Sequence, residues 1–329
     1  MNSNNIPKHL KRYIVEQNYD RYSIIDHNVW SFIMEISIPF FKKHAHHTYF
    51  QGLKKTGITF DKIPSIERMN DKMNKFGWGA VAVRGFIPPA IFMEFQALGI
   101  LPIACDMRSS EHLTYTPAPD IVHESAGHSP IIINEEYAHY LKEYGKIASR
   151  ATFSDTDKKI YYAIRHLSDI KEDRNATSNQ ILEAEQALID IKNSQSVPSE
   201  ATLLSRLHWW TVEYGLIGSL DNPKIYGAGL LSSVGESQNC LDNNVKKIPL
   251  SIDCINYNYD ITEQQPQLFV TKSFSELTDI LYEFQKTMSY YNNKSKINNL
   301  FENDYNQDEI FELTQPNHLN QQDSKLIKL

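Results

Sequence analysis

Apolar residues recur three and four positions apart in several long segments, which is the spacing of one face of an α-helix. This pattern predicts a helix over residues 28–50 that is interrupted at Pro39, a helix over 135–151 and a last helix over 273–288. The apolar face of the second helix is an aromatic stripe, typical of a buried core, made of Tyr137, Tyr140, Leu141 and Tyr144.

Residues 155–200 predict an antiparallel helical hairpin, because two apolar stripes at helical spacing flank the polar run KEDRNATSNQ. The stripes are made of Ile160, Ile164 and Leu167, and of Ile181, Ala184, Leu188 and Ile191. Residues 78–106 differ, because they are dense in apolar residues and punctuated by glycine and proline. They predict short strands and loops around a cavity.

The C-terminal stretch changes composition. Residues 290–329 are rich in Asn, Gln, Asp and Lys with only scattered apolar residues, so we expect a mostly disordered tail with one short helix around DEIFEL. The domain organisation expected is therefore one domain over residues 1–289 followed by this tail. No internal repeat is visible.

Composition narrows the class of protein. The 329 residues are 41% apolar and 11% aromatic, enough for a sizeable core, and the net charge of −7 excludes an extended cationic surface for nucleic acid. No apolar run approaches the roughly 18 residues that span a bilayer, and the N-terminus has no secretory pattern. Three widely spaced cysteines, Cys105, Cys240 and Cys254, predict reduced thiols in a cytoplasmic protein.

The stretch PDIVHESAGHSP, residues 119–130, carries candidate metal ligands. In zinc-protease motifs the histidines are four apart, about 40° from each other around a helix, whereas His123 and His128 are five apart, about 140° on a regular helix. They could share a metal only if the helix begins or bulges inside the motif. Two unrelated histidines near a loop remain the alternative.

A second stretch, LHWWTVEYGL, places Glu213 among aromatic and apolar residues on a segment expected to be buried. A buried carboxylate needs a partner or a metal. Two histidines and one carboxylate match the facial triad that holds Fe(II) and leaves positions open for other ligands. The alternative for Glu213 is a salt bridge to Arg206 or Lys224.

Three blocks in order, YTPAPDIVHESAGHSP, WWTVEYGL and IYGAGLLSSVGE, resemble the catalytic domain of the pterin-dependent aromatic amino acid hydroxylases, with a likeness from about residue 75 to 288. With the expected helices, this resemblance implies a mainly α fold with small β elements and an inserted helical hairpin. It implies an iron site with His123, His128 and Glu213 as ligands.

The resemblance also implies an amino acid pocket. Arg108 would clamp the substrate carboxylate through its two-pronged guanidinium, and Asp120 would hold that arginine in place. The rest of the pocket would be Thr116, Pro119, Trp209, Gly229 and Ser232, with the Ser232 hydroxyl orienting a ligand histidine.

For the pterin, the resemblance implies contacts from the stretch RGFIPPAIFMEF, where Gly85 and Ile87 form the loop and Phe92 stacks on the ring. Glu124, which follows the first histidine, would contact the pterin and the water on the iron. The chain departs from the family pattern at Pro89, Ser125, Ala126 and His208, where serine, leucines and tyrosine are common, and in the additional hairpin.

The activity implied is an iron- and tetrahydropterin-dependent monooxygenase that uses O2 to convert phenylalanine to tyrosine, as in aromatic amino acid catabolism. Ile261 falls where tyrosine hydroxylases carry an acid, which favours phenylalanine or tryptophan as substrate. Tryptophan hydroxylation, a non-catalytic binding protein that retains the fold, and a zinc hydrolase with Glu124 as base are the alternatives. The oligomeric state stays open.

Overall fold

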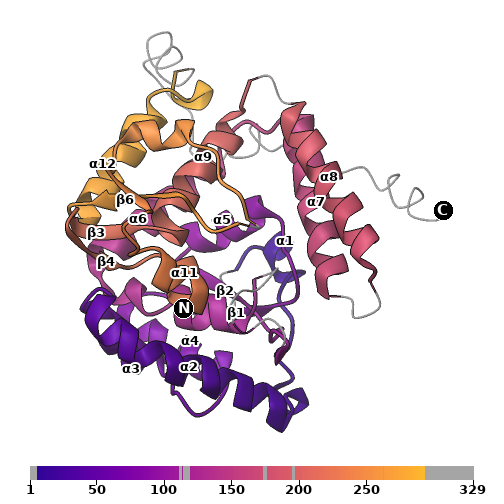
Figure 1. Cartoon of the computed structure of the whole chain (residues 1–329), viewed down its shortest axis with the longest axis vertical. Coiled ribbons are helices and arrows are strands. Elements are labelled where there is room, and N and C mark those ends of the chain that lie inside the picture. The colour runs from indigo at the N-terminus through magenta and orange to yellow at the C-terminus, as the bar shows by residue number, and fades with distance from the viewer. Residues whose placement is uncertain are drawn as a thin grey trace. The chain divides into compact units, whose positions relative to one another are not determined.

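Helices make up most of the part of the chain that the computed structural model describes, residues 6–110, 113, 119–172, 176–194, 197–261 and 263–292 (Figure 1). By internal contacts the chain divides into two compact units, Met1–Gln285 and Lys286–Leu329. The α-helices are α1 Lys8–Lys11, α2 Ile24–His44, α3 Thr48–Thr56, α4 Ile66–Met73, α5 Pro89–Ala97, α6 Glu135–Ala148, α7 Asp155–Glu172, α8 Ser178–Asn193, α9 Glu200–His208, α10 Ala228–Ser232, α11 Val234–Asn239 and α12 Phe274–Gln285.

Two small sheets accompany the helices. The strands are β1 Gly79–Val83, β2 Ile100–Ala104, β3 Leu216–Ser219, β4 Asn222–Ile225, β5 Lys246–Pro249 and β6 Gln267–Thr271. β1 and β2 are parallel and joined through α5, while the second sheet has the order β4-β3-β6-β5, with β3 antiparallel to β4 and parallel to β6. The expectation of a mainly α fold with small β elements is confirmed.

The first long helix differs from its prediction. Residues 28–50 divide into α2 and α3 at Ala45, and α2 begins earlier, where Ser23 and Asp26 form a capping box. Pro39 lies inside α2 and does not end it. Because Pro39 and Glu35 both face solvent, water can satisfy the Glu35 carbonyl that loses its amide partner.

The stretch 78–106 also contains a helix that the sequence did not predict. α5 begins at Pro89, at the first helical turn, where proline is tolerated because its missing N–H would have no partner in the helix. α5 packs on α6, whose aromatic stripe is part of the core as expected. Tyr137, Tyr140 and Tyr144 are all almost fully buried.

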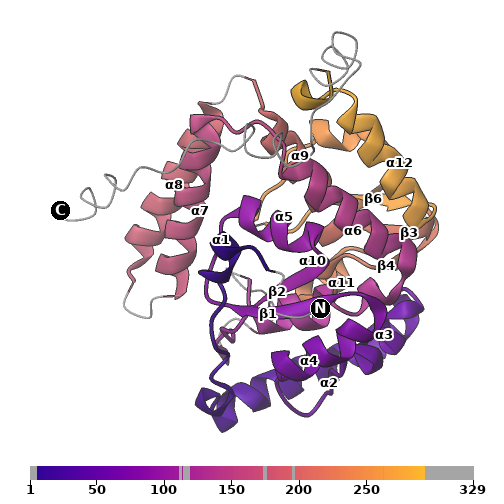
Figure 2. The same cartoon turned by 180° about the vertical axis from the view of Figure 1, so that it is seen from behind.

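The predicted hairpin is present as α7 and α8, which run side by side in both views (Figures 1 and 2). A capping box at Thr177 and Gln180 begins α8. The last predicted helix is also present as α12, and the amide of Glu276 donates to the Ser273 hydroxyl at its start.

Other sequence expectations meet the structure only in part. Cys105, Cys240 and Cys254 are free and buried. Among the described helices none has the length and apolar character to cross a membrane. The expected tail with its short helix falls almost wholly on residues 293–329, outside the described residues, so the domain division at residue 289 stays a prediction.

Candidate metal centre and active site

The two candidate histidine ligands lie on a π-helix, η5, which spans Val122–His128. Hydrogen bonds in a π-helix join residue i to residue i+5, so residues five apart lie on the same side of it. His123 and His128 therefore face the same point, with their Nε2 atoms 3.1 Å apart. The histidine spacing that does not fit a regular helix fits this one.

Small residues accompany the unusual winding of η5. A Cβ atom on Gly127 would lie 2.6 Å from the carbonyl oxygen of Ala228, so only glycine lets η5 approach α10 this closely. The hydroxyls of Ser125 and Ser129 donate to the carbonyl oxygens of Ile121 and Ser125, four residues earlier. Leucine at position 125 could not make this bond.

Glu213 completes a cluster of three possible ligands. It is the last residue of a second π-helix, η7, Trp209–Glu213, which follows directly on α9. Its Oε2 lies 3.4 Å from His123 Nε2, and its Oε1 lies 3.3 Å from His128 Nε2. Ligand atoms about 2.1 Å from one ion and at right angles are about 3 Å apart. The spacing, and a donor set of two imidazoles and a carboxylate, fit an Fe(II) ion with open positions.

Ser232 fixes the tautomer of the first histidine. The Ser232 hydroxyl has one hydrogen and lies 2.7 Å from the carbonyl oxygen of Ala228, to which it donates. It can then only accept from His123 Nδ1, which is 3.0 Å away. The proton is therefore on Nδ1, and the lone pair of His123 Nε2 is directed at the other ligands.

The charges of the cluster suit metal binding. Burial alone would raise the pKa of Glu213, but His128 and His123 hold it well below its usual range. Burial lowers the pKa of His123 to about 4, whereas the Glu213 carboxylate outweighs burial and raises the pKa of His128. In the metal-free protein Glu213 is thus ionised and His123 neutral, the states in which both bind metals.

The two cations considered as partners of Glu213 bond elsewhere. Arg206 donates to the carbonyl oxygen of Ile255 at 3.0 Å, and Lys224 donates to that of Lys43 at 2.8 Å. Among the described residues, the ion-pair partners of Glu213 are histidines.

Glu124 is buried beside the cluster but is not one of its three converging ligands. Its Oε2 is 3.9 Å from His128 Nε2 and has no hydrogen-bond partner among the described residues. Burial raises the pKa of Glu124 to about 8. Since a buried polar atom is rarely left unpaired, this oxygen is available to a bound molecule.

Arg108 and Asp120 form a buried pair close to the ligands. Arg108 Nε and Nη2 donate to Asp120 Oδ2 and Oδ1 at 2.7 and 2.8 Å, and the backbone amides of Arg108 and His123 donate to the same carboxylate. Burial would raise the pKa of Asp120, but the guanidinium lowers it below its ordinary value. Asp120 thus holds both the arginine and the start of η5.

The residues expected around the pterin follow β1. Gly85 has a positive φ of 58° and donates its amide to Asp106 Oδ2 at 3.1 Å. Ile87 packs on a buried cluster that includes Phe95. The ring centroid of Phe92, on α5, is 6.3 Å from that of His128, so the structure brings Phe92 beside the ligands.

The expected amino acid pocket is partly described. Trp209 stacks between Tyr214 and Tyr259, with ring centroids 4.5 and 4.3 Å away. Gly229 lies against Glu213, because a Cβ atom would be 3.1 Å from the Glu213 carbonyl oxygen. Pro119 is half-buried just before η5. Thr116 lies outside the described residues.

Two residues near the cluster were not among the expected site residues: Tyr259, which the sequence analysis did not name, and His208, which it named only as a departure from the family pattern. His208 Nδ1 is 3.7 Å from Glu213 Oε1, burial lowers the pKa of His208 to about 4, and its Nε2 has no hydrogen-bond partner among the described residues. Tyr259 covers Trp209. The features of the sequence that could have pointed to these two residues are that His208 lies five positions before Glu213 and Tyr259 lies two positions before Ile261.

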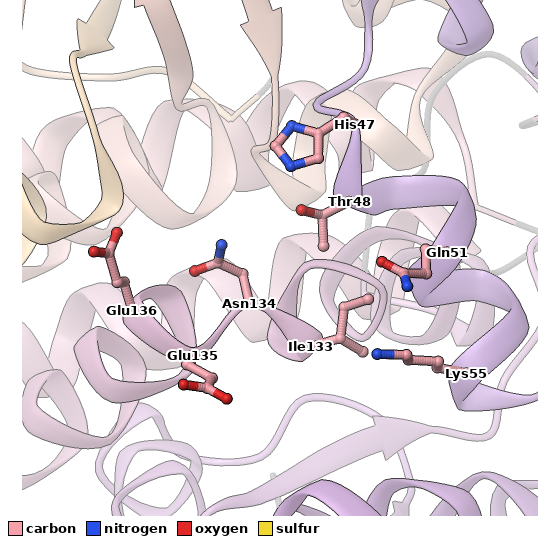
Figure 3. A pocket seen from close by; sticks show the side chains of 8 residues that line it. All are labelled: His47, Thr48, Gln51, Lys55, Ile133, Asn134, Glu135 and Glu136. Atoms are coloured by element: carbon pink, nitrogen blue, oxygen red, sulfur yellow. The ribbon is translucent and has the colours of Figure 1, made fainter.

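A surface hollow of about 360 Å³ shares no residue with this site (Figure 3). Its walls come from α3 and from the segment that enters α6, and its lining is largely polar: His47, Thr48, Gln51, Lys55, Ile133, Asn134, Glu135 and Glu136. The metal cluster is thus separate from this hollow.

The chain has clear relatives among known proteins. The family described as biopterin-dependent aromatic amino acid hydroxylase matches residues 12–176 and 187–319. The chain belongs to this family. The unmatched residues 177–186 fall on the turn into α8 and its first half, whereas the rest of the hairpin is matched, so an insertion as long as residues 155–200 stays a prediction.

Relatives from a bacterium and from human are both named phenylalanine-4-hydroxylase. The phenylalanine-4-hydroxylase of Chromobacterium violaceum is 30% identical over 270 residues, which cover 81% of this chain and 76% of that protein. The human phenylalanine-4-hydroxylase is 27% identical over 265 residues, 79% of this chain and 49% of the human protein. A crystal structure of the Chromobacterium enzyme with iron(III) and 7,8-dihydrobiopterin matches with a TM-score of 0.66 at 27% identity, covering 85% of this chain and 92% of that one.

Proposed function

We propose that this chain is an iron- and tetrahydropterin-dependent monooxygenase that hydroxylates L-phenylalanine to L-tyrosine with O2. The observation that carries the proposal is the convergence of His123, His128 and Glu213 next to a buried arginine that suits an amino acid carboxylate. The names of the relatives and the iron and dihydrobiopterin in the Chromobacterium structure support it.

In this proposal the ligands hold iron through His123 Nε2, His128 Nε2 and a Glu213 oxygen, and Ser232 keeps His123 in the binding tautomer. Iron and the reduced pterin, when bound, supply the activation of O2. Phe92 offers a ring face beside the ligands for a flat heterocycle, with Gly85 and Ile87 on the loop that leads to it. Glu124 offers its unpaired buried oxygen to the same molecule.

The amino acid would be held by its carboxylate. Arg108 uses Nε and one hydrogen on each terminal nitrogen for Asp120 and the Ser232 carbonyl, so one N–H on each of Nη1 and Nη2 remains for the substrate. Trp209, Pro119, Gly229 and Thr116 would line the space for the ring. Ile261, half-buried and apolar, offers no charge to a hydroxylated ring and supports phenylalanine.

The location that goes with this function is the cytoplasm, and the free, buried state of the three cysteines supports it.

One assay tests the function. The purified chain is loaded with Fe(II) and given tetrahydrobiopterin, O2 and either phenylalanine, tryptophan or tyrosine, and the hydroxylated amino acid is measured. We expect tyrosine from phenylalanine, with much less product from tryptophan. Faster hydroxylation of tryptophan than of phenylalanine would mean that tryptophan is the substrate. No product from any of the three amino acids, with iron bound, would refute the function.

Variants test the site. His128→Ala should lose both iron and activity, whereas His139→Ala, an exposed histidine on α6, should keep both. Arg108→Lys should keep iron but raise the KM for phenylalanine by about 10- to 100-fold, because lysine cannot make the two-pronged contact. Iron retained in His128→Ala would show that the ligands are wrong.

A further inference from the structure

The α7–α8 hairpin is tied to the rest of the fold at its base. The Glu200 carboxylate accepts from the amide of Thr152 at 2.9 Å, and the amide of Ala201 donates to the Thr152 carbonyl at 3.3 Å. In the first turn of α7, Asp157 accepts from the Thr202 hydroxyl at 2.7 Å. The chain therefore leaves and re-enters the domain at one fixed point.

The inner face of the hairpin contacts a loop that borders the metal site. Leu167, Ala184 and Leu188 form a small buried cluster between α7 and α8, and Ile261 packs against it from the loop 257–261. In the same loop, the ring of Tyr259 has the Lys192 ammonium of α8 6.0 Å from its centroid, a distance at which a cation still attracts an aromatic face.

The loop 257–261 in turn packs on Trp209 and Trp210, the two aromatic residues at the start of the π-helix that contains Glu213. Tyr259 stacks on Trp209 with 12° between the ring planes, and the Tyr257 carbonyl accepts from Trp210 Nε1 at 3.0 Å. Trp209 and Trp210 open the π-helix that ends at Glu213. A continuous path of contacts thus runs from the hairpin through the loop to the metal helix.

The hairpin also contacts the loop expected to border the pterin. The Tyr161 hydroxyl donates to the carbonyl oxygen of Phe86 at 3.3 Å, and the two rings are 6.1 Å apart. Phe86 lies between Gly85 and Ile87. The hairpin therefore touches the loops of both proposed binding sites.

We propose that the α7–α8 hairpin is a brace that positions the substrate loop through Ile261 and Tyr259 and the pterin loop through Phe86, and so sets the affinity for both molecules. This proposal rests on the proposed function. It assigns positioning roles to Leu188, Lys192 and Tyr161, none of which contacts the ligand cluster.

The two contacts can be tested separately because they lie on different helices. Leu188→Ala should raise the KM for phenylalanine on the order of tenfold, since truncating a buried leucine loosens the cluster that holds Ile261. The KM for tetrahydrobiopterin and the iron content should not change. Leu182→Ala is the matched control, because Leu182 is on the same helix and 61% exposed.

Tyr161→Phe should show the opposite split. Loss of one neutral hydrogen bond should raise the KM for tetrahydrobiopterin about three- to tenfold and leave the KM for phenylalanine unchanged. Tyr162→Phe is its control, because Tyr162 is 58% exposed on α7. Lys192→Ala should raise the KM for phenylalanine two- to fivefold by about the strength of one cation–π contact, and Lys192→Arg should restore it.

Amide hydrogen exchange supplies a readout that does not depend on activity. In Leu188→Ala the amides of residues 257–261 should exchange faster than in the parent, while those of η5 should not. If the hairpin amides exchange faster and the loop and both KM values stay within twofold of the parent, the brace is refuted. If Leu188→Ala does not fold, the Lys192 and Tyr161 variants decide by the same criteria.

Failure of the proposed function has a different signature. A parent chain that binds iron but hydroxylates no amino acid refutes the function, and the exchange of residues 257–261 then still shows whether the hairpin braces the loop. A parent that is active, with variants that are indistinguishable from it, refutes the brace alone.

Discussion

The Asp120→Asn substitution tests the buried pair on which substrate binding is proposed to depend. Asp120 accepts four hydrogen bonds, two on each oxygen, from the backbone amides of Arg108 and His123 and from Arg108 Nε and Nη2. An asparagine keeps one acceptor oxygen. Whichever way its amide is turned, two bonds are lost and an NH2 group faces two donors.

The magnitude follows from burial. The Arg108 side chain is 0% exposed and that of Asp120 5%, so the guanidinium would keep its charge without a counter-ion or water. Breaking a buried ion pair by removing one partner costs about 3 to 5 kcal/mol. For a domain near 285 residues this corresponds to a fall in Tm of roughly 5 to 8 °C.

Urea and thermal unfolding at pH 7 measure this loss, and a phenylalanine titration measures binding. Glu143→Gln is the control, because it breaks the Lys146–Glu143 pair, whose lysine is 54% exposed, and leaves an amide oxygen that can still accept from the Tyr282 hydroxyl. It should cost under about 1 kcal/mol. Replacing the pair by Arg108→Met with Asp120→Leu should recover much of the stability but no phenylalanine binding. A cost below about 1 kcal/mol for Asp120→Asn would show that the pair is hydrated and the reasoning wrong.

The pH dependence of this cost has a definite sign. The folded-state pKa of Asp120 lies below its ordinary value of 3.8, so the pair stabilises fully above that pH and is lost only as the pH falls further. The difference in unfolding free energy between the parent and Asp120→Asn should therefore be constant from pH 5 to 8 and shrink below about pH 4.

Three further predictions concern single residues. Ser232→Ala removes the partner of His123 Nδ1 and should weaken iron binding about 10- to 100-fold in a metal titration while the fold is retained. His208→Phe removes a buried nitrogen, Nε2, that has no hydrogen-bond partner among the described residues. This variant should keep iron and have an unfolding free energy in urea up to about 1 kcal/mol higher than that of the parent. Loss of iron would show that His208 is a metal ligand. Burial raises the pKa of Glu236 from 4.5 to about 7, so the parent should lose stability as pH rises between these values. The unfolding free energy of Glu236→Gln should then be at most about 3 kcal/mol above that of the parent at pH 8 and equal to it at pH 4, in denaturant titrations at both pH values.

Local patterns explain which parts of the fold were predictable. The hairpin was predicted because Leu167 and Leu188 belong to stripes whose period shows in the sequence, and helices form from such stripes wherever they pack. The packing of the hairpin against the rest of the fold was not predicted, because its contacts to Ile261 and Phe86 join residues about 75 positions apart. The path of α2 through Pro39 was missed for a similar reason, since it depends on which side of the helix faces water.

The site, too, has parts that the sequence predicted and parts that it did not. The family motifs pointed to His123, His128 and Glu213, and the structure brings their ligand atoms together. The sequence left open how histidines five apart could converge, because a π-helix depends on contacts such as Gly127 against Ala228 that only the folded chain provides. The sequence showed His208 only as a departure from the family's tyrosine, because one imidazole five residues before a ligand has no pattern that would place it against Glu213.

The π-helix at His123–His128 contains one residue more than an α-helix would need to span the same turn. Removing Ala126 would leave the letters H-E-S-G-H, a match to the H-E-x-x-H pattern in which two histidines four apart bind zinc. A single codon thus separates the two spellings. The shorter helix would be the more regular one, but its histidines would meet a metal from a different angle, and Glu213 would no longer be at the third corner. The choice between two kinds of metal chemistry in such a segment can therefore depend on the number of its residues as well as on their identity.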